Sequence, residues 1–183
     1  LLNLYFDANN NGDYLDTDVG GVNETIPYTT TTTANGGYYL FDGLPPGRFY
    51  VQVAPSNFAA LAALDGFISS SGSFTTENVD VNDNGQDSPT YLTNGISSVN
   101  FILSHGGEPL TTSIPPDETD INTSGIYGPN NVGNFGQAEA DSNLTLDFGF
   151  IQPPRSLGNR LWFDDDNDGQ FDAGELPVVG AQV

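Results

Sequence analysis

Short apolar segments alternate with turns rich in Asp, Asn, Gly and Pro along most of this chain, and this pattern restricts the fold more than any other feature. The 183 residues include 22 glycines and 12 prolines, which leave little room for long helices. The 12 phenylalanines and 8 tyrosines suit strands whose pleated surface is half buried. The sequence therefore predicts an all-β sandwich, and its length fits one domain or one domain plus part of another.

Seven segments have the composition of strands and are bounded by turn residues. They are residues 2–6, 29–33, 38–41, 48–53, 96–104, 144–150 and 157–163. Asn35 and Gly36 separate the second segment from the third, which predicts a hairpin there. Residues 58–64 form the one segment with helical propensity, and they are short enough to allow at most two turns.

The charge balance excludes several classes of partner. The chain carries 24 acidic residues against three arginines, has no lysine, and has a formal net charge of −21 at pH 7. Such a charge argues against nucleic acids, whose phosphates need a basic face, and against anionic membranes. Two explanations remain: clustered carboxylates that bind metal cations, or an acidic surface that interacts only with water. Because there is no cysteine, disulfides are excluded and a metal ion is the obvious remaining staple.

The most specific motif is the acidic loop 164–175, which fits the calcium-binding pattern D-x-[DN]-x-[DN]-G-x5-E at every fixed position. Calcium prefers six to eight oxygen ligands, and alternate residues of a tightly curled loop direct theirs inward. The predicted ligands are Asp164, Asp166, Asp168, the carbonyl of Gln170, Asp172 and Glu175. No amphipathic helix flanks the loop, so we expect the ion to hold a connection between two strands and to stabilise the fold.

Two weaker loops have similar spacing. The first offers Asp7, Asn9, Asn11, Asp13, Asp16 and Asp18, with fewer carboxylates at the first positions and Asp18 in place of the closing glutamate. The other offers Asp80, Asn82, Asn84 and the carbonyl of Gln86. Its twelfth position is Tyr91, so a closing ligand would come from elsewhere, with Glu108 as a candidate. A plain polar turn is the alternative for both loops.

The same inventory of side chains makes an enzyme a poor interpretation. His105 is the only histidine, and without cysteine neither a histidine-based metal site nor a nucleophile relay has support. Paired carboxylates could act as a glycosidase pair, but their spacing in Asp/Asn/Gly loops is explained better by calcium. We therefore expect no catalytic residue, and Ca²⁺ as the only cofactor.

Several segments resemble one known family. Residues 156–169, which read Ser-Leu-Gly-Asn-Arg-Leu-Trp-Phe before the acidic loop, resemble the opening of the calcium-binding B-type repeats of serine-aspartate-repeat bacterial surface adhesins. Residues 32–47 resemble the middle hairpin of that repeat, and residues 80–87, 106–109 and 143–150 resemble its later strands and acidic loop. The resemblance implies a transthyretin-like or immunoglobulin-like sandwich, in an extracellular stalk that calcium makes rigid.

The order of these segments is rotated relative to the family, because the segment that opens the repeat comes last here. We therefore expect residues 1–152 to be a repeat that lacks its first strand, with an insertion at about 110–140 that departs from the family. Residues 153–183 would then be a linker plus the first strand and calcium loop of the next repeat or subunit. Two assemblies fit: a tandem array, which we favour, or subunits that lend a strand to the next one in a filament.

The sequence thus predicts a structural repeat of an extracellular filament, stalk or cell-surface adhesin, with neighbouring copies arranged head to tail as partners. We expect no nucleic acid partner and no insertion into a membrane, since no apolar run reaches the length of a membrane helix. The alternative is an adhesive or carbohydrate-binding module that uses exposed tyrosines in residues 106–142. A glycan array separates the two hypotheses, because a pure scaffold shows no selective binding.

Overall fold

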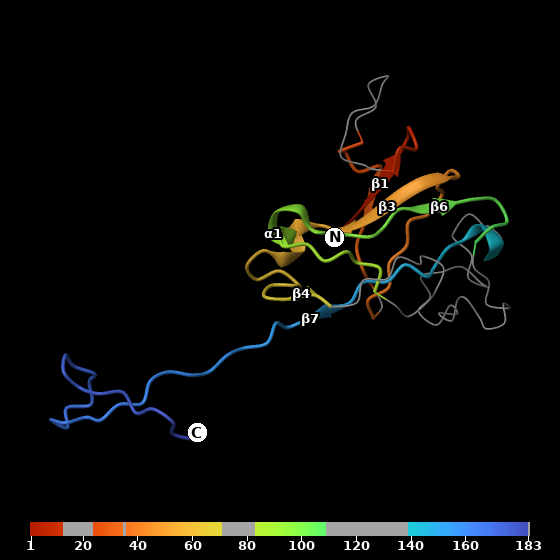
Figure 1. Cartoon of the computed structure of the whole chain (residues 1–183). Coiled ribbons are helices and arrows are strands. Elements are labelled where there is room, and N and C mark those ends of the chain that lie inside the picture. The colour runs from red at the N-terminus through yellow and green to blue at the C-terminus, as the bar shows by residue number, and fades with distance from the viewer. Residues whose placement is uncertain (13–23, 35, 71–82, 109–138, 183) are drawn as a thin grey trace. The chain divides into compact units, whose positions relative to one another are not determined.

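The computed structural model describes residues 1–12, 24–34, 36–70, 83–108 and 139–182 (Figure 1). The chain divides into two compact units, Leu1–Pro153 and Pro154–Val183. We describe each unit by itself, and their assignment to successive repeats stays a prediction. Most of the expected insertion at 110–140, and of the alternative adhesive segment 106–142, lies outside the described residues.

The larger unit is built on an antiparallel sheet whose two longest strands are β1 (Leu2–Asp7) and β3 (Gly47–Val53). Figure 1 shows these two strands side by side, with Leu4 opposite Val51 in the register. On the far side of β1 lies β2 (Thr29–Thr31), while β5 (Ile96–Ser97) and β6 (Phe101–Leu103) both pair with β3.

A second, smaller sheet consists of β4 (Ile68–Ser69) and β7 (Phe150–Ile151), which are antiparallel. The described helices are single turns: the 3-10 helices η1 (Pro55–Phe58) and η2 (Glu139–Asp141), and α1 (Tyr91–Asn94). The regular elements of the described chain are therefore mostly strands in antiparallel sheets, with almost no helix, which confirms the predicted all-β sandwich. No described helix has the length and apolar character needed to cross a membrane.

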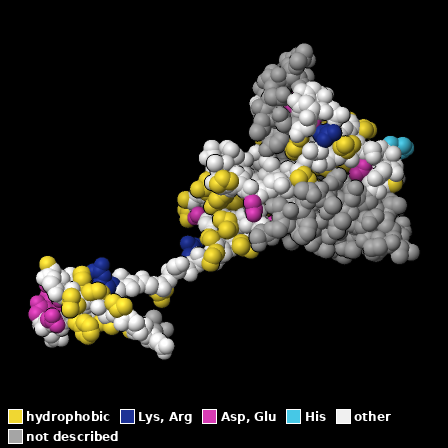
Figure 2. All heavy atoms as spheres, viewed as in Figure 1, with side chains coloured by type: hydrophobic (Ala, Val, Ile, Leu, Met, Phe, Trp, Pro, Cys, Tyr) yellow, Lys and Arg dark blue, Asp and Glu magenta, His cyan; other side chains and the backbone are white. Residues whose placement is uncertain are grey.

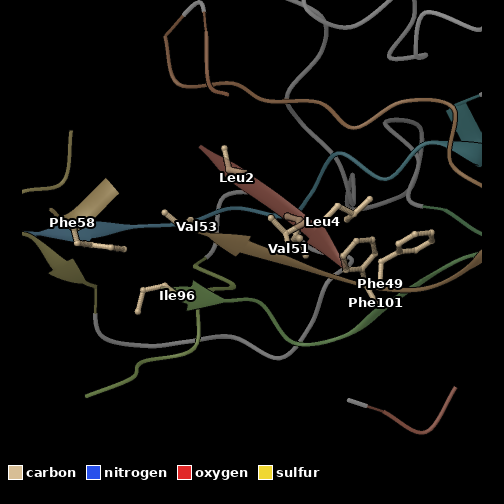
Figure 3. Close-up of a cluster of buried hydrophobic side chains, with 9 residues drawn as sticks. Leu2, Leu4, Phe49, Val51, Val53, Phe58, Ile96 and Phe101 are labelled. Carbon is tan, nitrogen blue, oxygen red and sulfur yellow. The ribbon is translucent and has the colours of Figure 1, made fainter. Parts of the chain in front are cut away.

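The core lies on one face of the large sheet. Leu2 and Leu4 of β1 pack beside Val51 and Val53 of β3, because alternate residues of a strand point to the same face (Figure 3). The remaining buried apolar members of the cluster are Phe49, Phe58, Ile96, Phe101 and Leu146. Each such side chain stabilises the fold by roughly 1.5–3 kcal/mol relative to an exposed one. The alternation of β1 and β3 thus accounts for most of the core.

The prediction of a helix at residues 58–64 is wrong, because the helical turn lies just before this segment. Instead, η1 ends at Phe58, and the following residues form successive turns. Leu61 has a φ of 68°, which is the left-handed region that a right-handed helix does not allow. The N–H of Leu61 donates to the Asp65 carboxylate at 2.9 Å, so the segment is a tight loop with local hydrogen bonds.

Five of the seven expected strands form only in part: 29–33 and 96–104 are shortened or interrupted, 144–150 pairs only at Phe150, and 38–41 and 157–163 are reduced to single bridges. The hairpin expected around Asn35-Gly36 is reduced to one bridge between Ala34 and Tyr38, with the Ala34 N–H 2.8 Å from the Tyr38 oxygen. Residues 39–42 and 144–149 belong to no strand, although 39–41 are apolar and aromatic and 144–150 alternate as a strand does. A strand requires a regular ladder of backbone hydrogen bonds, whereas the backbone of Asp147 bonds to Asn84 and the Leu146 oxygen accepts the Tyr39 hydroxyl.

Candidate metal centre

The loop that begins at Asp164 curls around its own carboxylates. The two Asp164 carboxylate oxygens accept the N–H groups of Asp168 at 3.1 Å and of Gly169 at 3.0 Å. The Asp166 carboxylate accepts the Asp168 N–H at 3.3 Å. Positive φ angles of 60° at Asn167 and 76° at Gly169 allow the sharp turn. As a result, one carboxylate oxygen from each of Asp164, Asp166 and Asp168 lies within 4.8 Å of the others.

Glu175 closes this loop. One of its oxygens accepts the Asp165 N–H at 3.0 Å, and the other accepts the Asp172 N–H at 2.9 Å. The N–H of Gln170 donates to the Asp168 carboxylate at 2.7 Å. Hydrogen bonds from backbone N–H groups of the loop therefore hold the carboxylates of the predicted ligands in place.

Antiparallel backbone bonds flank the loop. The Phe163 N–H donates to the Leu176 oxygen at 3.0 Å, and the Val178 N–H donates to the Leu161 oxygen at 2.9 Å. Beside them, Trp162 packs edge-on against Phe171, with ring centroids 6.1 Å apart. Figure 2 shows acidic side chains gathered at one edge of this unit, next to exposed hydrophobic ones. The loop therefore connects two short extended segments.

The carboxylates of this exposed loop have the chemistry that a hard cation requires. Calcium accepts oxygen ligands at about 2.3–2.6 Å in flexible geometry, which suits three carboxylates and a closing glutamate. Magnesium demands near-ideal octahedral geometry at shorter distances and keeps several waters. The donor set of Asp164, Asp166, Asp168 and Glu175 thus fits calcium.

The first loop repeats this hydrogen-bond pattern at the end of β1. The two carboxylate oxygens of Asp7 accept the N–H groups of Asn11 at 3.1 Å and Gly12 at 2.9 Å, the fourth and fifth residues after it. Asn9 accepts the Asn11 N–H at 2.7 Å. The described part of this loop therefore has the same local geometry as the Asp164 loop. The other three predicted ligands, Asp13, Asp16 and Asp18, lie outside the described residues.

Glu24 is a member of this first loop that the spacing motif does not include. Its carboxylate accepts the N–H of Ala8 at 2.5 Å and of Asn9 at 3.3 Å, and only 2% of the residue is exposed. Ala8 directly follows Asp7, as Asp165 follows Asp164, so Glu24 occupies the place that Glu175 has in the other loop. A fixed twelve-residue window misses it because it lies 17 residues after Asp7. The one available signal was that Glu24 is the only glutamate among the first 76 residues.

A cation of the protein also contacts the first loop. The guanidinium of Arg48 lies 3.4 Å from the Asp7 carboxylate, which is fully buried. The same side chain donates to Asn10 and to Asn100, each at 2.7 Å. Arg48 therefore offsets part of the negative charge of this loop. Among the described residues, no ion pair does the same for the Asp164 loop.

The third loop is tied into the fold by Asn84. Its N–H donates to the Asp147 oxygen and its side-chain oxygen accepts the Asp147 N–H, both at 2.8 Å, and the residue is fully buried. The Gln86 N–H donates to the Ser97 oxygen at 2.8 Å. These contacts favour a structural role for Asn84 and Gln86. Asp80 and Asn82 lie outside the described residues, so a metal site here stays a prediction.

Glu108 contacts a different part of the unit. Its carboxylate accepts the Ser104 N–H at 2.6 Å, and its own N–H donates to the Ala140 oxygen at 3.1 Å. Burial raises the pKa of the Glu108 carboxyl above its usual value, against the lowering effect of hydrogen bonds from Ser104 and Asn143. Asp141, which pairs with His105 at 2.9 Å, raises that pKa further. No described contact joins Glu108 to the third loop.

Comparison with known proteins identifies two related groups of sequences. The chain is 28% identical to serine-aspartate repeat-containing protein D of Staphylococcus aureus (strain Newman), across 98% of this chain and 19% of that protein. It is 32% identical to serine-aspartate repeat-containing protein C of the same strain, across 55% of this chain and 10% of that protein. No family model and no solved structure matches.

The chain spans less than a fifth of the length of these curated relatives. Their names describe repeats, and the match covers nearly the whole of this chain. The homology agrees with an extracellular or cell-surface location and with a role as a repeat of a surface adhesin. The resemblance that residues 156–169 and 32–47 suggested is thereby confirmed, and the chain is a homologue of part of the serine-aspartate repeat-containing proteins C and D.

Proposed function

We propose that this chain is a structural repeat of a surface stalk, filament or adhesin, and that calcium bound in its acidic loops makes it rigid. The observation that carries the proposal is the approach of the Asp164, Asp166 and Asp168 carboxylates to within 4.8 Å of one another, in a loop closed by Glu175. Carboxylates held this close repel one another unless a cation neutralises them.

The position of the loop explains how an ion would stiffen the chain. The bonds from Phe163 to Leu176 and from Val178 to Leu161 lie directly beside it. An ion bound by residues 164–175 would prevent these two extended segments from separating. Because binding to the folded form stabilises that form, rigidity would then depend on the calcium concentration.

The first loop would supply a second and weaker site. Asp7 and Glu24 are both buried, and the Asn9 side chain adds an oxygen beside them. The Arg48 guanidinium lies 3.4 Å from Asp7 and would lower the affinity for a cation. We therefore expect the Asp164 loop to bind calcium more tightly than the Asp7 loop.

The test is a calorimetric titration of the whole chain with Ca²⁺, before and after the substitution Asp168→Asn. We expect this change to weaken the tighter site by about tenfold or more, since extracellular modules bind near 0.1–1 mM and depend on ligand charge. Asp165→Asn is the matched control, because it removes the same charge from the same loop at a position between ligands. Equal effects of the two substitutions, or no uptake of Ca²⁺ by the unsubstituted chain at millimolar concentrations, would contradict the proposal.

A further inference from the structure

An aspartate followed directly by a glycine is a chemically reactive pair, because the glycine nitrogen can attack the carboxyl carbon of the aspartate and close a cyclic succinimide. Glycine has no Cβ, so this backbone nitrogen is accessible to the side chain before it. The chain contains three such pairs, at residues 42–43, 65–66 and 168–169. The position of each glycine nitrogen relative to its aspartate decides which pair is prepared to react.

At residues 42–43 the nitrogen lies against its own aspartate. The Gly43 N–H donates to Oδ1 of Asp42 at 2.8 Å. Because Oδ1 is bonded directly to Cγ, this contact also brings the nitrogen close to the carbon that it attacks. Intramolecular reactions are fast when the reacting atoms are held about 3–3.5 Å apart and aligned. The hydrogen bond therefore holds this pair near the geometry of ring closure.

The other two pairs make hydrogen bonds to different residues. The Asp65 carboxylate accepts the N–H of Leu61 at 2.9 Å. The Gly169 N–H donates to the Asp164 carboxylate at 3.0 Å. In each of these pairs, a contact with another residue competes with ring closure, whereas the contact within residues 42–43 favours it.

We propose that residues 42–43 are a modification site at which Asp42 converts spontaneously into isoaspartate. In the first step the Gly43 nitrogen forms a bond to Cγ of the protonated carboxyl group, whose hydroxyl leaves with the proton of the nitrogen as water. In the second step water adds to the main-chain carbonyl carbon of Asp42 and breaks its bond to the Gly43 nitrogen. One water is released and one is consumed, so the mass of the chain is unchanged. Asp42 is partly exposed and Gly43 is exposed, so this water has access.

The product changes the connection that leads into β3. In isoaspartate the main chain runs through Cβ and Cγ, which lengthens it by one methylene group, and the former main-chain carbonyl becomes the free carboxylate. Tyr39 and Phe41 on one side pack against the core, and β3 begins at Gly47 on the other. The modification therefore alters the spacing between two anchored parts of the larger unit. It requires no metal ion, so this inference is independent of the calcium proposal.

The pair at residues 65–66 is a matched internal control. Residues 41–44 read Phe-Asp-Gly-Leu and residues 64–67 read Leu-Asp-Gly-Phe, so the two pairs have the same neighbours in opposite order. Asp65 and Gly66 are both exposed, so exposure alone predicts faster reaction at residues 65–66. The hydrogen bond from Gly43 to Asp42 predicts the opposite order.

The test is to incubate the whole folded chain at physiological pH and temperature for several weeks and to digest it. Electron-transfer fragmentation in a mass spectrometer then quantifies isoaspartate at each position. We expect at least about tenfold more isoaspartate at position 42 than at position 65, since small misplacements of reacting atoms change rates by up to about a hundredfold. Equal amounts at the two positions, or more at position 65, overturn the inference.

Two controls show whether the fold and the assigned residue are responsible. In concentrated guanidinium chloride the contact of Gly43 with Asp42 is lost, so the two positions should react equally. An excess at position 42 that persists in the denaturant overturns the role of the folded geometry. The variant Asp42→Glu keeps the negative charge, but its longer side chain must close a larger ring, so the signal should disappear. A signal that remains in this variant comes from another residue and overturns the assignment.

Discussion

The Asp7 loop and the Asp164 loop use the same local chemistry in two different settings. In each, the first aspartate accepts hydrogen bonds from the N–H groups of the fourth and fifth residues after it. A glutamate accepts the N–H of the residue directly after that aspartate. Asp7 and Glu24 are each 2% exposed, whereas Asp164 and its neighbours in the Asp164 loop are exposed.

The settings explain what each loop needs to hold its shape. The Asp7 loop extends from a strand of the main core and is supported by Arg48. The Asp164 loop belongs to a unit of thirty residues, in which Leu157, Leu161 and Phe163 remain exposed. So small a unit buries little apolar surface, so the proposed ion would supply much of its stability.

The largest expected effect is therefore the removal of calcium from the Asp164 loop. Trp162, the only tryptophan of the chain, packs against Phe171 in the same unit, so its fluorescence reports on that unit alone. At a calcium concentration of 100 times the dissociation constant, the ion would stabilise the unit by about 2.7 kcal/mol. We expect excess chelator to lower the midpoint of the fluorescence-detected melt. An unchanged melting midpoint in excess chelator would contradict the view that the Asp164 loop needs an ion to hold its shape.

The second prediction concerns which residue closes the Asp7 loop. Glu24→Gln should lower the stability of the larger unit by about 1–3 kcal/mol, since a buried carboxylate that accepts two N–H groups is replaced by an amide. It should also abolish the weaker calcium site. The measurement is urea-induced unfolding followed by far-UV circular dichroism, together with calorimetry.

Asp18→Asn is the control for this assignment, because Asp18 is the closing residue that the twelve-residue spacing predicts. We expect it to change stability by less than about 0.5 kcal/mol, because Glu24 already accepts the N–H groups of Ala8 and Asn9. A larger loss of calcium affinity from Asp18→Asn than from Glu24→Gln would restore the spacing-based assignment.

A third, smaller effect tests the cation beside Asp7. Arg48→Gln should raise the calcium affinity of the Asp7 loop several-fold, because it removes a positive charge 3.4 Å from a ligand carboxylate. The free energy of unfolding without calcium should fall by about 1–2 kcal/mol, since the hydrogen bonds to Asn10 and Asn100 are weakened. Arg155→Gln, far along the chain, should change neither quantity. An unchanged affinity would mean that Arg48 does not compete with the ion.

The smallest effect is a pH dependence that arises away from both loops. Burial raises the pKa of Glu108 above the ordinary 4.5, so the folded state binds this proton more strongly than the unfolded state does. Stability should therefore decrease as the pH rises from about 4.5 through the raised pKa, and the contribution should be constant above it. Glu108→Gln should remove this slope from unfolding curves measured between pH 4 and 7. Asp65→Asn, at an exposed loop, should leave it in place.

Local pattern predicted the parts of the fold that depend on local chemistry. The apolar-rich residues 2–6 and 48–53 became β1 and β3, because each has a partner of the right length. The same reasoning placed strands at 38–41 and 144–150, where only Phe150 and Ile151 pair as a strand. It did not find α1, whose four residues end at Gly95 with a φ of 69°.

The sequence by itself determined the all-β class and the acidic loop at 164–175, because strand periodicity and ligand spacing are properties of neighbouring residues. Only the tertiary structure brought Glu24 to the first loop and Arg48 onto Asp7, since both approach across long stretches of chain. It alone tied Asn84 to Asp147, which are 63 residues apart in the chain. Contacts between such distant residues depend on how the strands pack, and no local pattern encodes that packing.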